Sequence, residues 1–236
     1  MITLLAAILA AAAPLSAAAP ASPTHCAEAG TPDALICAAL EAERSGDHAT
    51  AAEDFEQAAK ASSDKDPKTA RMWAAAGNLW IAAKQPGKAA ADLDKALALP
   101  GLQAEQRGEA LLDRARAAEA QDDLKTARAK ANEAAGTISG DPFYWYFSAA
   151  LALREHDPIT AQTAINKALS LAPSDPTLLF EAGHVADTMG DDDKARSYWT
   201  RAAAADPNGD SGKAAAKAIE LLGVTPTLKT DRQPTK

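Results

Sequence analysis

The residue types that most often carry enzyme chemistry are present in this chain, but their spacing does not suit catalysis. No histidine lies three or four residues from another, the spacing of helix-borne metal ligands; the four are His25, His48, His156 and His184. The run Asp191-Asp192-Asp193 resembles a calcium loop only superficially, and acids are favoured at the start of a helix. Phosphate-binding glycine loops, nucleophile elbows and metalloprotease motifs are absent from the sequence. The sequence therefore predicts no catalytic residues, no metal site and no cofactor.

The residues best suited to recognising a partner form one aromatic run. The segment Phe143-Tyr144-Trp145-Tyr146-Phe147 holds five of the eleven aromatic residues. Successive residues of a helix point about 100° apart, so these five cannot share one buried face. Phe143 and Tyr146 are three residues apart and share a face, and aromatic side chains often anchor interfaces. Two interpretations stay open: this pair binds a partner, or it packs against the alanine-rich segment before it.

The elements that position these residues repeat every 34 residues. Three positions return at this spacing, with Ala161, Ala168 and Pro173 recurring as Ala195, Ala202 and Pro207. Within residues 176–209 a proline opens a first helix, Gly190 and Asp191 end it and start a second, and a proline closes the unit. Small residues such as Gly183 suit close approach of the two helices, and bulky residues such as Trp199 fill the space between them.

This pattern closely resembles the tetratricopeptide repeat, a 34-residue helix–turn–helix unit. The resemblance covers five units, with four-residue slips after the first and the second: residues 32–65, 70–103, 108–141, 142–175 and 176–209. It implies an all-α fold, a right-handed α-solenoid of about five helix–turn–helix repeats. A further helix over residues 213–222 is predicted to cap the array, so the repeat domain is assigned to residues 32–223. A helical-hairpin array of another type is the alternative.

The resemblance also implies where a partner binds, because in this family the first helix of each unit lines a concave groove. The partner-binding residues predicted on these helices are Asn78, Leu112, Arg116, Phe143, Tyr146, Ala150, Leu153, Arg154, Phe180 and His184. The same register places Asp33, Ile36, Arg71, Thr177 and Asp187 on the groove side. Only Asn78 and Arg116 resemble the set by which some relatives clamp a chaperone's terminal carboxylate, so that ligand is not predicted. The predicted partner is a protein or peptide.

The N-terminus indicates export. An uncharged apolar run from Ile2 to Ala13, followed by small residues, predicts a signal peptide over residues 1–21, with an irregular segment over residues 22–31. No lysine or arginine precedes the run, and an uncleaved membrane anchor is the alternative. The run is shorter than the ~20 residues that spanning requires. We therefore expect a bacterial protein that is periplasmic or secreted, with no stable membrane insertion after cleavage.

Two cysteines, Cys26 and Cys37, lie near the start of the exported chain. In an oxidising compartment they are predicted to form one disulfide, which would join the irregular segment to the first repeat. Closing so short a loop stabilises a fold by about 3 kcal/mol in the chain-entropy model. The alternative is that Cys37 is a small core residue and Cys26 a free, exposed thiol.

Charge and composition narrow the function classes. A net charge of −8 argues against nucleic-acid binding, which depends on neutralising phosphates, and gives no reason to expect adhesion to anionic lipid. Residues 224–236 are polar and contain two prolines, so this tail is predicted to be disordered. The sequence thus favours a non-enzymatic adaptor or scaffold of the cell envelope. A protein that binds a small ligand or a lipid headgroup through the aromatic fourth unit is the alternative, and an enzyme is a third, less expected class.

Overall fold

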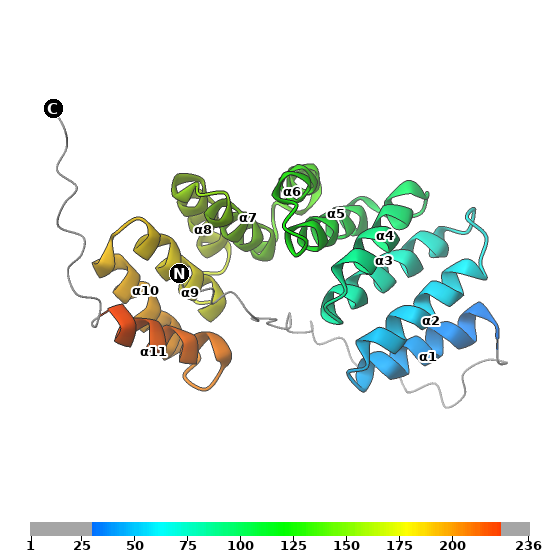
Figure 1. Cartoon of the computed structure of the whole chain (residues 1–236), viewed down its shortest axis with the longest axis horizontal. Helices are drawn as coiled ribbons and strands as arrows, with labels where there is room; N and C mark the ends of the chain where they lie inside the picture. The colour runs from blue at the N-terminus through cyan, green and yellow to red at the C-terminus, as the bar shows by residue number, and fades with distance from the viewer. Residues whose placement is uncertain (1–29, 223–236) are drawn as a thin grey trace. The chain divides into compact units, whose positions relative to one another are not determined.

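The computed structural model describes residues 30–222, in which every regular element is an α-helix (Figure 1). The predicted signal peptide, most of the irregular segment, Cys26 and the predicted tail lie outside the described residues. The helices are α1 (Pro32–Arg44), α2 (His48–Lys60), α3 (Pro67–Ala82), α4 (Pro86–Ala98), α5 (Ala104–Glu119), α6 (Leu124–Ile138), α7 (Pro142–Arg154), α8 (Pro158–Leu171), α9 (Pro176–Thr188), α10 (Asp192–Ala205) and α11 (Asp210–Leu222). The predicted all-α class is confirmed.

The described helices divide into two compact units. The N-terminal unit comprises α1 to α6 (residues 30–140), and the C-terminal unit comprises α7 to α11 (residues 141–222). Within each unit every helix packs against the next one along the chain, and some alternate helices also touch: α3 with α5, α7 with α9, and α9 with α11. Each unit is therefore built from antiparallel helix pairs whose first helices lie beside one another.

Side-chain caps fix where the helices begin. The Asp191 side chain accepts a hydrogen bond from the Lys194 backbone N–H at 3.1 Å, and Asp123 accepts one from Thr126 at 3.0 Å. These bonds satisfy donors that the first turn of a helix leaves unpaired. The interpretation of the acidic turns as helix caps is confirmed. The turn before α10 also needs a left-handed residue, which Gly190 supplies at φ 79°.

The slips in the repeat arise from longer first helices. Helices α3 and α5 have 16 residues each, whereas α1, α7 and α9 have 13. The extra residues lie at the start of the helix, so α3 begins at Pro67 and α5 at Ala104, before the first residues of the predicted units. The inserted residues therefore extend the first helices of the second and third predicted units by almost one turn.

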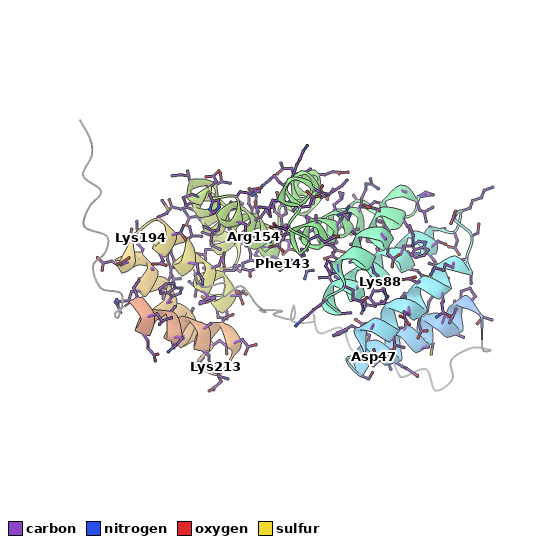
Figure 2. The ribbon with its side chains drawn as sticks, in the orientation of Figure 1. Asp47, Lys88, Phe143, Arg154, Lys194 and Lys213 are labelled. Carbon is purple, nitrogen blue, oxygen red and sulfur yellow. The ribbon has the colours of Figure 1, made fainter. Side chains whose placement is uncertain are left out.

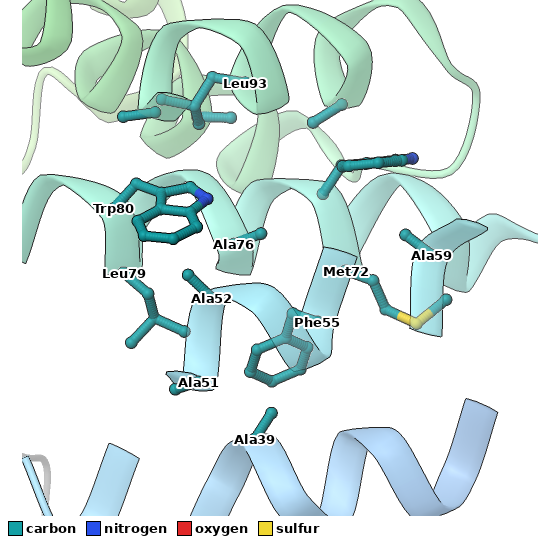
Figure 3. Close-up of a cluster of buried hydrophobic side chains, with 14 of the residues drawn as sticks. Ala39, Ala51, Ala52, Phe55, Ala59, Met72, Ala76, Leu79, Trp80 and Leu93 are labelled. Carbon is teal, nitrogen blue, oxygen red and sulfur yellow. The ribbon is translucent and has the colours of Figure 1, made fainter. Parts of the chain in front are cut away.

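In the pairs α9–α10 and α3–α4, close packing between the two helices depends on a glycine in the first helix. A Cβ added at Gly183 of α9 would overlap the indole of Trp199 from α10, which is 3 % exposed. A Cβ at Gly77 of α3 would likewise overlap Leu93 of α4, which lies above Trp80 and Ala76 in the core of the N-terminal unit (Figure 3). The prediction that small residues permit close approach while bulky ones fill the interface is confirmed.

The substitution Gly183→Ala should destabilise the fold by about 1–3 kcal/mol, because the added methyl group forces Trp199 out of its place. The measurement is denaturant unfolding followed by circular dichroism. The matched control is Gly136→Ala in α6, where a Cβ meets no atom within 4 Å. That change should leave stability unaltered or raise it by up to about 1 kcal/mol, through helix propensity alone. Equal stability of Gly183→Ala and the wild type would contradict this account of the packing.

Candidate functional site

A hydrogen bond between α9 and α11 fixes the register of the C-terminal unit. Thr177 Oγ1 and Ser211 Oγ lie 3.0 Å apart, and the two residues are separated by 34 positions. Equivalent positions of the repeat therefore lie beside one another in α9 and α11, and α11 packs against both α9 and α10. By the repeat register, we call one side of α7, α9 and α11 the first-helix face of the C-terminal unit. Its residues are Phe143, Tyr146, Ala150, Arg154, Phe180, Glu181, His184, Ala218 and Leu221.

Aromatic rings from α7 lie on this face. The rings of Phe143 and Tyr146 are 5.8 Å apart between centroids, and Phe143 is 38 % exposed. Their predicted sharing of one face is confirmed, and Figure 2 labels Phe143 together with Arg154 from the other end of α7. Tyr144 and Phe147 are buried, and Trp145 packs against the core between α7, α8 and α9. The aromatic run therefore supplies core residues and one exposed ring, Phe143. Tyr146 is partly buried and packs against the same core as Trp145.

A second aromatic cluster surrounds His184 on α9. The His184 ring lies 4.5 Å from the Phe180 ring and 5.6 Å from the Trp199 ring, with an edge-to-face geometry in both cases. The Trp199 Nε1 donates to the Phe180 carbonyl oxygen at 3.0 Å, which holds the cluster together. Burial lowers the pKa of His184, although the charge of Asp187 opposes this shift. Burial therefore favours the neutral imidazole of His184 over the cation.

Glu181 is the ionisable group of this face that sequence reasoning missed. It lies between Thr177 and His184 along the same side of α9, by helical spacing. Desolvation raises the pKa of the Glu181 carboxyl to about 7. Glu181 forms no hydrogen bond or ion pair with another residue in the range 30–222. A partly buried carboxyl group without a partner in the protein marks a candidate binding residue.

In the N-terminal unit, the structure brings together two predicted residues through a third. Asp113 of α5 accepts a hydrogen bond from the Asn78 side-chain amide of α3 at 2.8 Å, and from the Arg116 guanidinium at 2.7 Å. Asn78 and Arg116, which the sequence predicts as groove residues, are therefore joined by Asp113, which it does not predict. Arg116 and Asp113 are both partly buried, and this cluster is satisfied internally.

The prediction that Leu112 binds a partner is wrong. Leu112 is only 4 % exposed, and it lies four residues after Gly108, on the same side of α5. At Gly108 the backbone of α5 closely approaches Thr137 and Ile138 of α6. Leu112 therefore belongs to the side of α5 that packs in the core. The remaining predicted residues of the C-terminal unit, Ala150, Leu153 and Arg154, are partly buried, and Leu153 packs against the α7–α8–α9 core.

Two adjoining hollows lie between α1 and α3 in the N-terminal unit. Their volumes are about 260 Å³ and about 320 Å³, and both are lined by Ile36, Lys68 and Met72. The sequence register placed Ile36 and Arg71 on this side, and Arg71 lines the larger hollow. It missed Lys68, because α3 begins three residues before the predicted unit, and it missed Met72, a buried residue within that unit.

Over residues 30–222 no cluster of three or more histidine, cysteine or acidic side chains is arranged to hold a metal ion. None of the helices in that range is long and apolar enough to cross a bilayer. Cys37 is partly buried in α1, and its disulfide with Cys26 stays a prediction, because Cys26 lies outside the described residues.

The substitution Glu181→Gln should raise the melting temperature by about 2–4 °C above pH 7, the shift that 1 kcal/mol produces in a chain of this size. In the folded protein the pKa of the Glu181 carboxyl is about 7, above the ordinary value of 4.5. The protonated carboxyl therefore contributes stability that is fully present below pH 4.5 and is lost as the pH rises through 7. The measurement is thermal unfolding of both proteins between pH 4 and 8. Glu220→Gln, at an exposed glutamate paired with Lys217, is the control and should lack this gain. A melting difference that does not grow with pH would refute the assignment.

No family model matches the sequence, and no curated protein matches it either. Solved structures match its fold. PilW, described as a widely conserved type IV pilus biogenesis factor, gives a TM-score of 0.68 at 18 % identity, over 80 % of this chain and 84 % of PilW. YrrB, described as a tetratricopeptide-repeat protein with an unusual peptide-binding site, gives 0.57 at 16 % identity, over 78 % of this chain and 91 % of YrrB.

A tetratricopeptide-repeat protein from Parabacteroides merdae also matches, with a TM-score of 0.60 at 15 % identity, over 83 % of this chain and 72 % of that protein. Identities this low establish a common fold and leave function to be argued from the surface. The likeness agrees with the all-helical architecture described above. The chain has the fold of the tetratricopeptide-repeat proteins.

Proposed function

We propose that this protein is a non-enzymatic interaction scaffold that binds a peptide or protein segment on the first-helix face of its C-terminal unit. The observation that carries the proposal is the Phe143–Tyr146 pair. The repeat's own requirement for a bulky residue is met by Trp145, which packs inward. Phe143 is nevertheless a large apolar side chain that is 38 % exposed. Aromatic side chains on such a surface are typical anchors of a binding interface.

The fold is compatible with this role, since helical repeats offer extended surfaces in place of a single deep pocket. YrrB is described as having a peptide-binding site and PilW as a pilus biogenesis factor, which supports an interaction role here by analogy alone. We further propose five right-handed repeats, export through residues 1–21, and work in a bacterial cell envelope. The small-ligand alternative would use the aromatic surface of α7, whereas the hollows described above lie between α1 and α3.

The double substitution Phe143→Ala with Tyr146→Ala should reduce partner capture from envelope extract at least tenfold while the protein stays folded, because it removes both aromatic anchors. Capture is quantified by mass spectrometry, and folding by thermal unfolding. The control is Ile159→Ala, which truncates an apolar side chain that is 67 % exposed on α8, a second helix. This control should capture the same partners as the wild type.

The contrary result is equally clear. If the double variant melts at a much lower temperature while its folded fraction captures partners as well as the wild type, the two rings are core residues and the proposed face is wrong.

A further inference from the structure

Asp113 and Glu181 occupy the same place in the repeat. They are two periods of 34 residues apart, and each is the sixth residue of its predicted unit, on a first helix. Between α3 and α5 the sixth residue of one unit is hydrogen-bonded to the ninth residue of the preceding unit, in the Asn78–Asp113 pair. The surroundings of the two acids can therefore be compared position by position.

At Asp113 both carboxylate oxygens have a donor within the protein. Asn78, the ninth residue of the preceding unit, donates to Oδ2 at 2.8 Å, and Arg116, three residues further along α5, donates to Oδ1 at 2.7 Å. A charged acceptor with two such bonds is well stabilised, and the guanidinium also balances its charge. The N-terminal unit thus contains a complete acid cluster at this register position.

At Glu181 both donors are missing. The ninth residue of the preceding unit is Ala150, which has no polar side chain, and the residue three places further along α9 is His184. His184 is held between the rings of Phe180 and Trp199, and burial lowers its pKa, so it does not replace the guanidinium of Arg116. Glu181 therefore supplies the same acidic group as Asp113, but neither of the two donors found at Asp113 is present beside it. Its raised pKa is the expected property of such a carboxyl.

We propose that a lysine or arginine side chain of a bound segment donates to Glu181, in the place that Arg116 and Asn78 occupy at Asp113. This inference rests on the proposed function and specifies the partner: a segment with a basic residue next to apolar ones. The apolar residues contact the rings of Phe143, Tyr146 and Phe180 on the same face. Pairing with a cation removes the cost of an isolated carboxylate, so the charge pair adds specificity to apolar anchoring.

The test uses random twelve-residue peptides displayed on phage, selected against the full chain and then synthesised. Peptides whose binding is lost in the Phe143→Ala with Tyr146→Ala variant should be enriched in lysine or arginine beside apolar residues. Glu181→Gln should weaken them at least tenfold in isothermal titration calorimetry, and replacing the basic residue of the peptide with glutamine should cause a similar loss. In the Glu181→Gln protein, that peptide change should have little further effect, because the two groups act as one pair.

Two further variants separate charge pairing from a loss of structure. Ala150→Asn returns the amide that Asn78 supplies at Asp113, so it should weaken basic peptides several-fold without lowering the melting temperature. Glu133→Gln makes the same chemical change on α6, at an exposed glutamate near Lys130, and should leave binding unaltered.

Selected peptides that need the aromatic pair but are not basic, or that bind Glu181→Gln as tightly as the wild type, would overturn this inference and leave the proposed function standing. A failure to select any peptide that depends on the aromatic pair would overturn both.

Discussion

The structure depends on one packing constraint, the close approach of two helices across a small residue, which is a glycine at Gly77 and Gly183. At Gly183 the backbone of α9 lies directly under the indole of Trp199. This contact places the indole nitrogen on the Phe180 carbonyl and one ring edge against His184. The buried packing of the helix pair therefore also orients Phe180 and His184 of α9. Core and candidate binding surface are linked through a single tryptophan.

The same constraint separates residues that build the repeat from residues that are free to differ. Leu179 and Trp199 of the C-terminal unit satisfy the fold, as do Leu93 and Trp80 of the N-terminal unit, and all four are buried. The sixth and ninth positions of the first helices carry no such demand. One pair of them forms the Asp113 cluster with Asn78 and Arg116, which is complete within the protein. The other pair, Glu181 and Ala150, leaves Glu181 without a donor. Because of this difference, Glu181 is a candidate site for a cation of a partner.

Sequence periodicity was sufficient to predict the helices, their turns and the shared face of Phe143 and Tyr146, because these follow from local chain geometry. Other features depend on contacts between distant segments. Leu112 has the spacing of a groove residue, yet it is buried on the side of α5 that approaches α6. Glu181 carries no motif, and its importance emerges only from the absence of partners that Asp113 possesses. Lys68 was missed because a repeat register does not reveal that a helix starts almost one turn early.

The central claim is that Glu181 is an unpaired acid that a basic partner completes. Its most direct test is a pH titration of the side-chain carboxyl ¹³C resonances of all glutamates by nuclear magnetic resonance, with and without a selected basic peptide. The account predicts that Glu181 of the free protein titrates with a midpoint of about 7 and that the peptide lowers this midpoint. A midpoint near the ordinary value of 4.5 in the free protein, unchanged by the peptide, would contradict it.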